Sequence, residues 1–173
     1  MIQKYTYGTP FETDAIVTSI PASEGTPAYG TISTENGFSF TYDMDDNDVV
    51  YGLGESSRGI NKRGYVYESN CSDQPNHTED KISLYGAHNF IVISGKQTFG
   101  LFVDYPGKLK FDIGYTLSSQ LKIICEDADL YLYVIEGETP YDIVKQFRKI
   151  IGRSYIPPKF AFGFGQSRWG YTA

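Results

Sequence analysis

The polar side chains that could do chemistry are concentrated in one stretch, residues 55–80. This stretch has weak apolar periodicity and contains acids, bases, amides and one histidine: Arg58, Asn61, Lys62, Arg63, Asn70, Asp73, His77, Glu79 and Asp80. A polar segment of this length inside a compact domain is usually either a functional loop or a disordered one. Only a short strand over 65–67 is expected within it.

The short motifs for cofactor or metal binding are all incomplete. The segments 52–57 and 163–168 each begin with Gly-x-Gly but lack the third glycine of a dinucleotide-binding fingerprint. The acidic segment 43–48 lacks the glycine and the glutamate of a calcium loop, so we expect a solvated turn there. His77 and His88 have no metal-ligand spacing. The sequence therefore predicts no cofactor and no metal site.

The charge balance restricts the class of partner. The chain has 21 acidic and 15 basic residues, a net charge of −6, and no run of basic residues. We therefore expect no nucleic acid and no anionic membrane as partner, but a neutral or small molecule. With so many carboxylates some pair lies close by chance, and no pattern singles out a pair that could hydrolyse a bond.

Cysteine usage and hydropathy favour a soluble cytoplasmic protein. Cys71 and Cys125 are too few for a disulfide framework or a cysteine-rich zinc site, and we expect both to be reduced. The first residues contain no apolar signal core, and no apolar run approaches the length of a membrane span.

Alternating apolar residues and regularly spaced turns predict a mostly β fold. Aromatic residues make up 16% of the chain, and Gly and Pro supply turns. One or two short strands are expected within 1–35. Longer strands are expected at these positions: 37–42, 49–54, 89–94, 98–104, 109–115, 121–125 and 130–135. Short strands at this spacing indicate an antiparallel β-sandwich.

One helix is predicted after the strands, over 139–151. Thr139 is a good N-cap, Pro140 suits the first helical position, and Gly152 supplies the stop. The prolines at 157 and 158 then break the chain. Aromatic residues alternate with small ones from Phe160 onward, which is typical of a new strand. The sandwich is therefore expected to end near residue 136.

Taken on these patterns alone, the chain is a β-sandwich with one long polar loop and no visible chemistry. Such a chain would be a binding or structural domain.

Four longer strings, however, resemble segments of glycoside hydrolase family 31. They occur in the order and spacing found in that family, and the resemblance is closest to its bacterial α-glucosidases. The strings are V-Y-G-L-G-E at 50–55, L-Y-G-A-H-N-F at 84–90, F-G-L-F-V-D-Y-P at 99–106, and Y-I-P-P-K-F-A-F-G-F-G-Q-S-R-W-G-Y at 155–171.

The resemblance implies a galactose-mutarotase-like β-sandwich over 1–136, a linker helix and Pro-Pro break over 137–158, and the start of a truncated catalytic (β/α) barrel over 159–173. Members of the family hydrolyse terminal non-reducing α-linked sugars with retention, using two carboxylates about 5–5.5 Å apart. In the family both are aspartates on later barrel strands, which lie outside these 173 residues. The parent protein is thus expected to be an α-glucosidase, and this chain alone is expected to be inactive.

By the same resemblance, Asp73 and Trp169 are candidate substrate-binding residues. Asp73 lies where the family loop often places an aspartate that binds the sugar near the cleaved bond. Trp169 lies at the end of the first barrel strand, where an aromatic ring can stack on a sugar. Gln166 and Arg168 are expected to support this site. Without the resemblance, Asp73 would be one more solvated loop acid and Trp169 a core residue.

Several alternatives stay open. The parent could be an α-xylosidase or another α-glycosidase of the same family, because the residues that discriminate them lie mostly downstream. The chain could also be a free-standing carbohydrate-binding module or a purely structural sandwich. The expected partner is a small oligosaccharide of the maltose or isomaltose type, and a homo-oligomer is possible.

Overall fold

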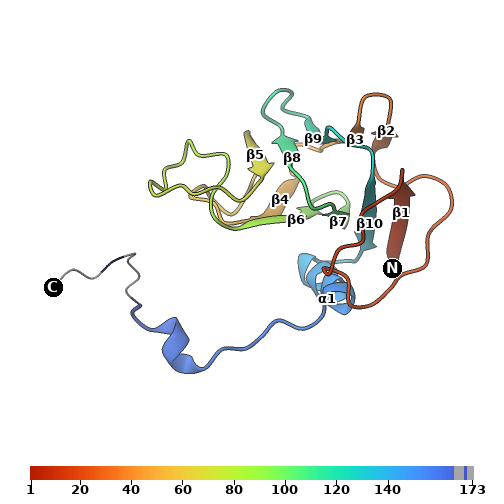
Figure 1. Cartoon of the computed structure of the whole chain (residues 1–173). Coiled ribbons are helices and arrows are strands. Elements are labelled where there is room, and N and C mark those ends of the chain that lie inside the picture. Colours follow the sequence, from red (N-terminus) through yellow and green to blue (C-terminus); the bar gives the residue numbers. More distant parts are fainter. Residues whose placement is uncertain (166–169, 171–173) are drawn as a thin grey trace.

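The chain folds into two antiparallel β-sheets that face each other, with one helix on the outside (Figure 1). The computed structural model describes residues 1–165 and 170. Within that part of the chain the strands, in sequence order, are β1 (Ile2–Tyr7), β2 (Thr31–Ser33), β3 (Phe38–Asp43), β4 (Val49–Gly54), β5 (Tyr65–Ser69), β6 (Ala87–Ser94), β7 (Thr98–Asp104), β8 (Leu109–Ile113), β9 (Gln120–Cys125) and β10 (Leu130–Glu136).

The strand order confirms the predicted sandwich. Sheet A has the order β1-β10-β7-β6-β4, and sheet B has the order β2-β3-β9-β8-β5. Each pairing between neighbouring strands is antiparallel. One or two short strands were expected within 1–35, and the structure has β1 and β2 there; the expected strand over 65–67 lies within β5.

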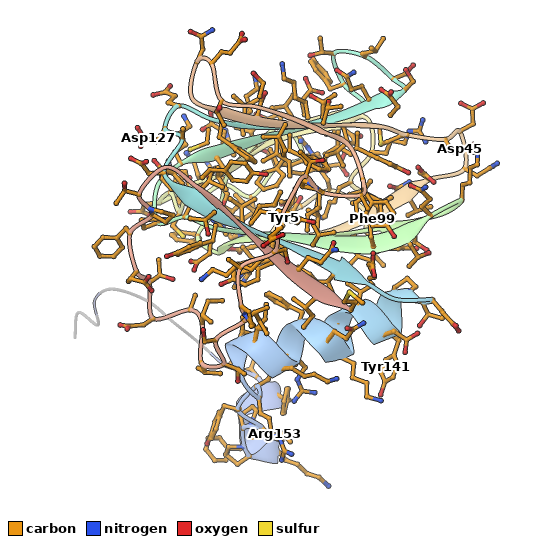
Figure 2. The ribbon with its side chains drawn as sticks, turned by 90° about the vertical axis from the view of Figure 1, so that its right-hand side faces the viewer. Tyr5, Asp45, Phe99, Asp127, Tyr141 and Arg153 are labelled. Carbon is orange, nitrogen blue, oxygen red and sulfur yellow. The ribbon has the colours of Figure 1, made fainter. Side chains whose placement is uncertain are left out.

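Aromatic and aliphatic side chains fill the space between the sheets. In β3, Phe38, Phe40 and Tyr42 point inward and are buried, while the residues between them are partly exposed. This alternation follows from the two-residue period of a strand with one buried face. Figure 2 shows Tyr5 and Phe99, two buried residues of sheet A, in this interior.

Helix α1 (Pro140–Ile151) covers the other face of sheet A, and it forms as predicted. The Thr139 hydroxyl accepts from the backbone N–H of Asp142, whose carboxylate accepts from the N–H of Thr139, so the capping box is complete. Ile143 is fully buried against the sheet. The helix can approach this closely because Gly100 lies beneath it. A Cβ atom on Gly100 would lie 2.4 Å from the Ile143 side chain.

The segment after α1 corrects one prediction. Lys159–Phe162 form a 3-10 turn rather than the start of a strand. Phe160, Phe162 and Phe164 are 81%, 74% and 97% exposed. A strand is stabilised by hydrogen bonds to a neighbouring strand, and within the described chain no strand pairs with this segment, which runs away from the sandwich (Figure 1). Alternation of side chains alone therefore does not impose strand geometry here.

The acidic turn between β3 and β4 also differs from expectation. Asp48 is buried rather than solvated. Its carboxylate accepts hydrogen bonds from the Tyr42 hydroxyl and from the N–H groups of Asp45 and Lys96. The guanidinium of Arg63 donates to three carbonyl oxygens of the same turn. The turn is thus an ordered structural joint.

Candidate functional site

The long polar loop that joins β5 to β6, residues 70–86, is the candidate site. It projects beyond the ends of these strands (Figure 1). Its two arms are joined near the base, where the N–H of Ser72 donates to the carbonyl of Leu84 at 2.9 Å. The side chain of Leu84 is only 3% exposed. The loop is therefore anchored to the sandwich, although most of its polar side chains face solvent.

Asp73 lies on this loop and is hydrogen-bonded to Tyr85. The Tyr85 hydroxyl donates to Oδ1 of Asp73 at 2.7 Å. This hydrogen bond stabilises the protonated form of the Tyr85 hydroxyl, because a carboxylate can accept a hydrogen bond only from the neutral phenol. It therefore raises the pKa of Tyr85 above its ordinary value. Within residues 1–165 and 170, no hydrogen bond reaches the second carboxylate oxygen, Oδ2. Asp73 is exposed as a residue, so a ligand can reach its side chain.

Two further side chains surround Tyr85. The His77 ring packs against the Tyr85 ring in an edge-on geometry, with centroids 5.5 Å apart. His77 Nδ1 lies 3.9 Å from Oε1 of Glu55. The other oxygen of Glu55 accepts from the N–H of Gly86 at 2.9 Å. Glu55, Asp73, His77 and Tyr85 together form what we call the loop cluster.

A bulge at the end of β4 positions Glu55. The pairing of β4 with β6 shifts register between Gly52 and Gly54. Leu53, between them, has a φ of 69°, in the left-handed region that non-glycine residues rarely adopt. Such a conformation costs on the order of 1–3 kcal/mol. The buried Leu53 side chain offsets this cost, and the bulge directs Glu55 toward the loop.

Arg58 provides a second anchor for the loop. Its Nε donates to the carbonyl of Glu79 at 2.6 Å, and its Nη1 donates to the carbonyl of Val66 at 2.8 Å. The guanidinium also lies over the rings of Tyr65 and Tyr67, at 4.3 and 4.9 Å from their centroids. The distal part of the loop is thereby held to β5.

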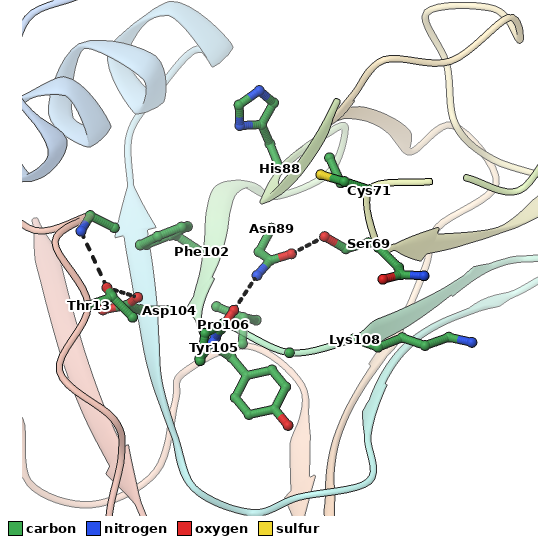
Figure 3. Close-up of a pocket in the computed structure, with 15 residues that line it drawn as sticks. Thr13, Ser69, Cys71, His88, Asn89, Phe102, Asp104, Tyr105, Pro106 and Lys108 are labelled. Carbon is green, nitrogen blue, oxygen red and sulfur yellow. Dashed lines mark hydrogen bonds between the residues drawn. The ribbon is translucent and has the colours of Figure 1, made fainter. Parts of the chain in front are cut away.

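An open groove of about 570 Å³ begins at the base of the loop (Figure 3). It is lined by residues of the N-terminal segment, of the end of β5 and the loop, of β6 and β7, and of the connection from β7 to β8: Thr13, Ala15, Ser69, Asn70, Cys71, Ala87, His88, Asn89, Phe102, Val103, Asp104, Tyr105, Pro106, Gly107 and Lys108.

The polar groups of the groove are largely neutral and already hydrogen-bonded. Asn89 donates to the carbonyl of Tyr105 at 3.0 Å and accepts from the Ser69 hydroxyl. The Thr13 hydroxyl donates to Asp104 at 2.6 Å, and burial raises the pKa of the Asp104 carboxyl above its usual value. Figure 3 shows both networks beside Phe102. Amide, hydroxyl and aromatic groups suit a hydroxyl-rich ligand.

Neither a metal-binding group of side chains nor a membrane-spanning helix is found among the described residues. No group of three or more His, Cys, Asp and Glu side chains within 1–165 and 170 is arranged to hold a metal ion. In the same part of the chain, no helix has the length and apolar character needed to cross a bilayer. The two cysteines are not bonded to each other.

Of the predicted site residues, the structure describes only Asp73. It lies in the loop cluster, as an exposed and partly engaged carboxylate. Gln166, Arg168 and Trp169 lie outside the described residues and stay predictions.

Sequence reasoning missed the other members of the loop cluster. Glu55 ends the first string that resembles the glycosidase family, and Tyr85 lies in the second. Both were therefore visible as motif residues, but no pattern assigned them a contact. His77 stood alone, with no spacing to suggest a partner. Their proximity depends on the β4 bulge and the fold of the loop, which no local pattern encodes.

Comparison with known proteins identifies relatives. A family model described as the glycosyl hydrolase 31 N-terminal galactose mutarotase-like domain matches residues 9–112. Alpha-glucosidase 2 of Bacillus thermoamyloliquefaciens is 31% identical over 147 residues, which are 79% of this chain and 19% of that protein. Alpha-xylosidase XylQ of Lactiplantibacillus pentosus is 27% identical over 120 residues, 69% of this chain and 15% of that protein.

Solved structures agree with the sequence relatives. A GH31 dextranase of Flavobacterium johnsoniae, complexed with glucose, matches 77% of this chain and 16% of its own, at 26% identity and a TM-score of 0.69. This chain spans a fifth or less of the length of these relatives. The family model covers more than half of the 173 residues, and the two-sheet sandwich agrees with it. The chain therefore belongs to the family of glycosyl hydrolase 31 N-terminal galactose mutarotase-like domains.

Proposed function

We propose that this chain is the N-terminal part of a retaining α-glucosidase that removes terminal non-reducing α-linked glucose, and that Asp73 binds the sugar. The observation that carries the role of Asp73 is its geometry. Tyr85 holds one carboxylate oxygen, while no hydrogen bond from the described residues reaches the other oxygen of this exposed residue on an anchored loop. A carboxylate oxygen accepts hydrogen bonds from sugar hydroxyls readily.

The chain would shape the substrate pocket rather than cleave the bond. The catalytic aspartate pair that the family resemblance implies lies outside these 173 residues, so we propose that the chain alone is inactive. The proposed division is a sandwich over 1–136, a linker over 137–158 and the start of the barrel over 159–173. Trp169 is proposed to line the sugar site, with Gln166 and Arg168 supporting it.

The role of Asp73 is tested in the protein encoded by the longest reading frame that contains these residues. Asp73→Ala should lower kcat/KM for maltose and isomaltose by about 10- to 100-fold, because a hydrogen bond to a charged group contributes roughly 1.5–3 kcal/mol. The matched control is Asp80→Ala, which removes an exposed carboxylate from the same loop. Unchanged kcat/KM in Asp73→Ala, with folding intact, would refute the role of Asp73.

A second candidate activity is α-xylosidase, because the similarity to an α-xylosidase covers 69% of this chain, against 79% for the α-glucosidase. The two are separated by comparing hydrolysis of aryl α-glucoside and aryl α-xyloside by the same enzyme. A non-catalytic binding role is tested by calorimetric titration of the 173-residue chain with maltose and isomaltose. Submillimolar affinity of the chain alone would favour a binding module, for which the groove of Figure 3 is the candidate surface.

A further inference from the structure

Tyr85 is held at a fixed position between two anchored neighbours. Leu84, before it, is buried. Gly86, after it, forms two hydrogen bonds with Glu55. Its N–H donates to Oε2 of Glu55 at 2.9 Å, and its carbonyl accepts from the N–H of Glu55 at 2.9 Å. Because both neighbours are fixed, the Tyr85 side chain has little freedom at its base.

The ring of Tyr85 is restrained as well. Its side chain is 47% exposed, so it is not held by burial. Instead His77 packs against it, and His77 is in turn 3.9 Å from the Glu55 carboxylate. The charged and titratable groups that surround Tyr85 are therefore Asp73, His77 and Glu55. Of these, only Asp73 accepts a hydrogen bond from the Tyr85 hydroxyl.

We propose that Tyr85 is a positioning residue, whose hydroxyl orients the Asp73 carboxylate so that Oδ2 faces the substrate. This inference rests on the proposed sugar-binding role of Asp73. A free carboxylate on an exposed loop rotates about its last bond and spends little time in a productive orientation. The bond from Tyr85 to Oδ1 fixes that rotation before substrate arrives, which lowers the entropic cost of binding.

Removal of the hydroxyl should affect binding more than turnover. In the protein encoded by the longest reading frame that contains these residues, Tyr85→Phe should raise KM by about three- to tenfold and change kcat by less than about twofold. The expected rise in KM corresponds to the loss of one hydrogen bond from a neutral donor. Tyr115→Phe is the matched control, since it removes an exposed hydroxyl for which no hydrogen bond is found in the described chain. It should leave both constants unchanged.

A double-mutant cycle isolates the pathway through Asp73. In the Asp73→Ala background, Tyr85→Phe should leave KM unchanged, because there is no carboxylate left to orient. If Tyr85→Phe raises KM equally in both backgrounds, Tyr85 acts independently of Asp73 and the inference is overturned. If Asp73→Ala itself has no effect, the proposed function fails instead. The two failures are thus distinguishable.

A measurement that does not depend on enzymatic activity tests the hydrogen bond between Tyr85 and Asp73. In the 173-residue chain with ¹³C-labelled tyrosine, the titration of Tyr85 is assigned by its absence in Tyr85→Phe and then compared between wild type and Asp73→Ala. The hydrogen bond holds the pKa of Tyr85 above its ordinary value, so loss of the carboxylate should lower that pKa. An unchanged titration would show that the hydrogen bond does not form in solution, and it would overturn the inference.

Discussion

Replacement of Asp48 by alanine should destabilise the sandwich strongly. Asp48 is 2% exposed, and its carboxylate accepts three hydrogen bonds that join three segments. The donors are the Tyr42 hydroxyl at 3.0 Å, the N–H of Asp45 at 2.9 Å and the N–H of Lys96 at 3.2 Å. The hairpin after β6 packs directly on this carboxylate, since a Cβ atom on Gly95 would lie 2.0 Å from its Oδ1.

The size of this loss of stability depends on whether each hydrogen-bond donor can reach water in the Asp48→Ala variant. Tyr42 is 7% exposed, so its hydroxyl loses its partner and has little access to water, at a cost of about 1–3 kcal/mol. The two N–H groups lie nearer the surface and are partly rehydrated, and they add about 1 kcal/mol together. We expect a loss of about 3 kcal/mol in the free energy of unfolding. For a chain of this size that lowers Tm by roughly 6–12 °C.

Urea unfolding followed by far-UV circular dichroism, with calorimetry for Tm, measures this loss. Asp48→Asn keeps one oxygen acceptor and should cost less, about 1–2 kcal/mol. Asp46→Ala, in the same turn but exposed, should change stability by less than about 0.5 kcal/mol. If Asp48→Ala were as stable as Asp46→Ala, the carboxylate would be solvated, as the sequence pattern suggests, and the reasoning from burial would be wrong.

Two other substitutions probe the helix and the groove. Phe147→Ala should lower the free energy of unfolding, measured in urea, by about 2–4 kcal/mol, because the Phe147 ring stacks on Phe90 with centroids 3.9 Å apart. Val144→Ala, on the exposed side of α1, should lower it by less than about 1 kcal/mol. Equal losses in the two variants would contradict this packing. Asp104→Asn should become increasingly more stable than wild type as pH rises from about 4 toward 7. Burial raises the pKa of Asp104 above 3.8, so the folded protein binds this proton more tightly than the unfolded chain does. The contribution of the protonated carboxyl to the free energy of unfolding is therefore complete at acid pH, and it is lost as pH rises and the carboxyl ionises in the folded state. A pH-independent difference in stability between Asp104→Asn and wild type would argue against the assignment.

The secondary structure was largely predictable because it depends on local patterns. The two-residue alternation of β3, the hairpin around Gly95 and the capping of α1 by Thr139 each involve residues close in sequence. The segment at 160–165 shows the limit of this reasoning. Its alternation is the same as that of a strand, yet it forms a turn, because a strand also requires a neighbour to pair with.

Of the four members of the loop cluster, only Asp73 is a residue that the sequence singles out, and its role in a site stays a prediction. Asp73 was identified through the resemblance of the surrounding strings to a known family, and not through any chemical pattern of its own. Its partner Tyr85 was present in one of those strings, yet only the structure shows the hydrogen bond that joins them. The burial of Asp48 was likewise invisible, since five of the six residues at 43–48 are Asp or Asn and resemble a solvated turn.

The sequence by itself determined the strands of the sandwich, the helix, the sandwich class and the family, since these follow from side-chain periodicity, capping residues and short strings. Tertiary structure alone decided which carboxylates are buried and which polar side chains meet. Asp48 is joined to Lys96, and Glu55 to Gly86, across 48 and 31 positions. Such contacts depend on the order of the strands and on the β4 bulge. Many strand orders are compatible with one pattern of alternation, and only the packed sandwich selects among them.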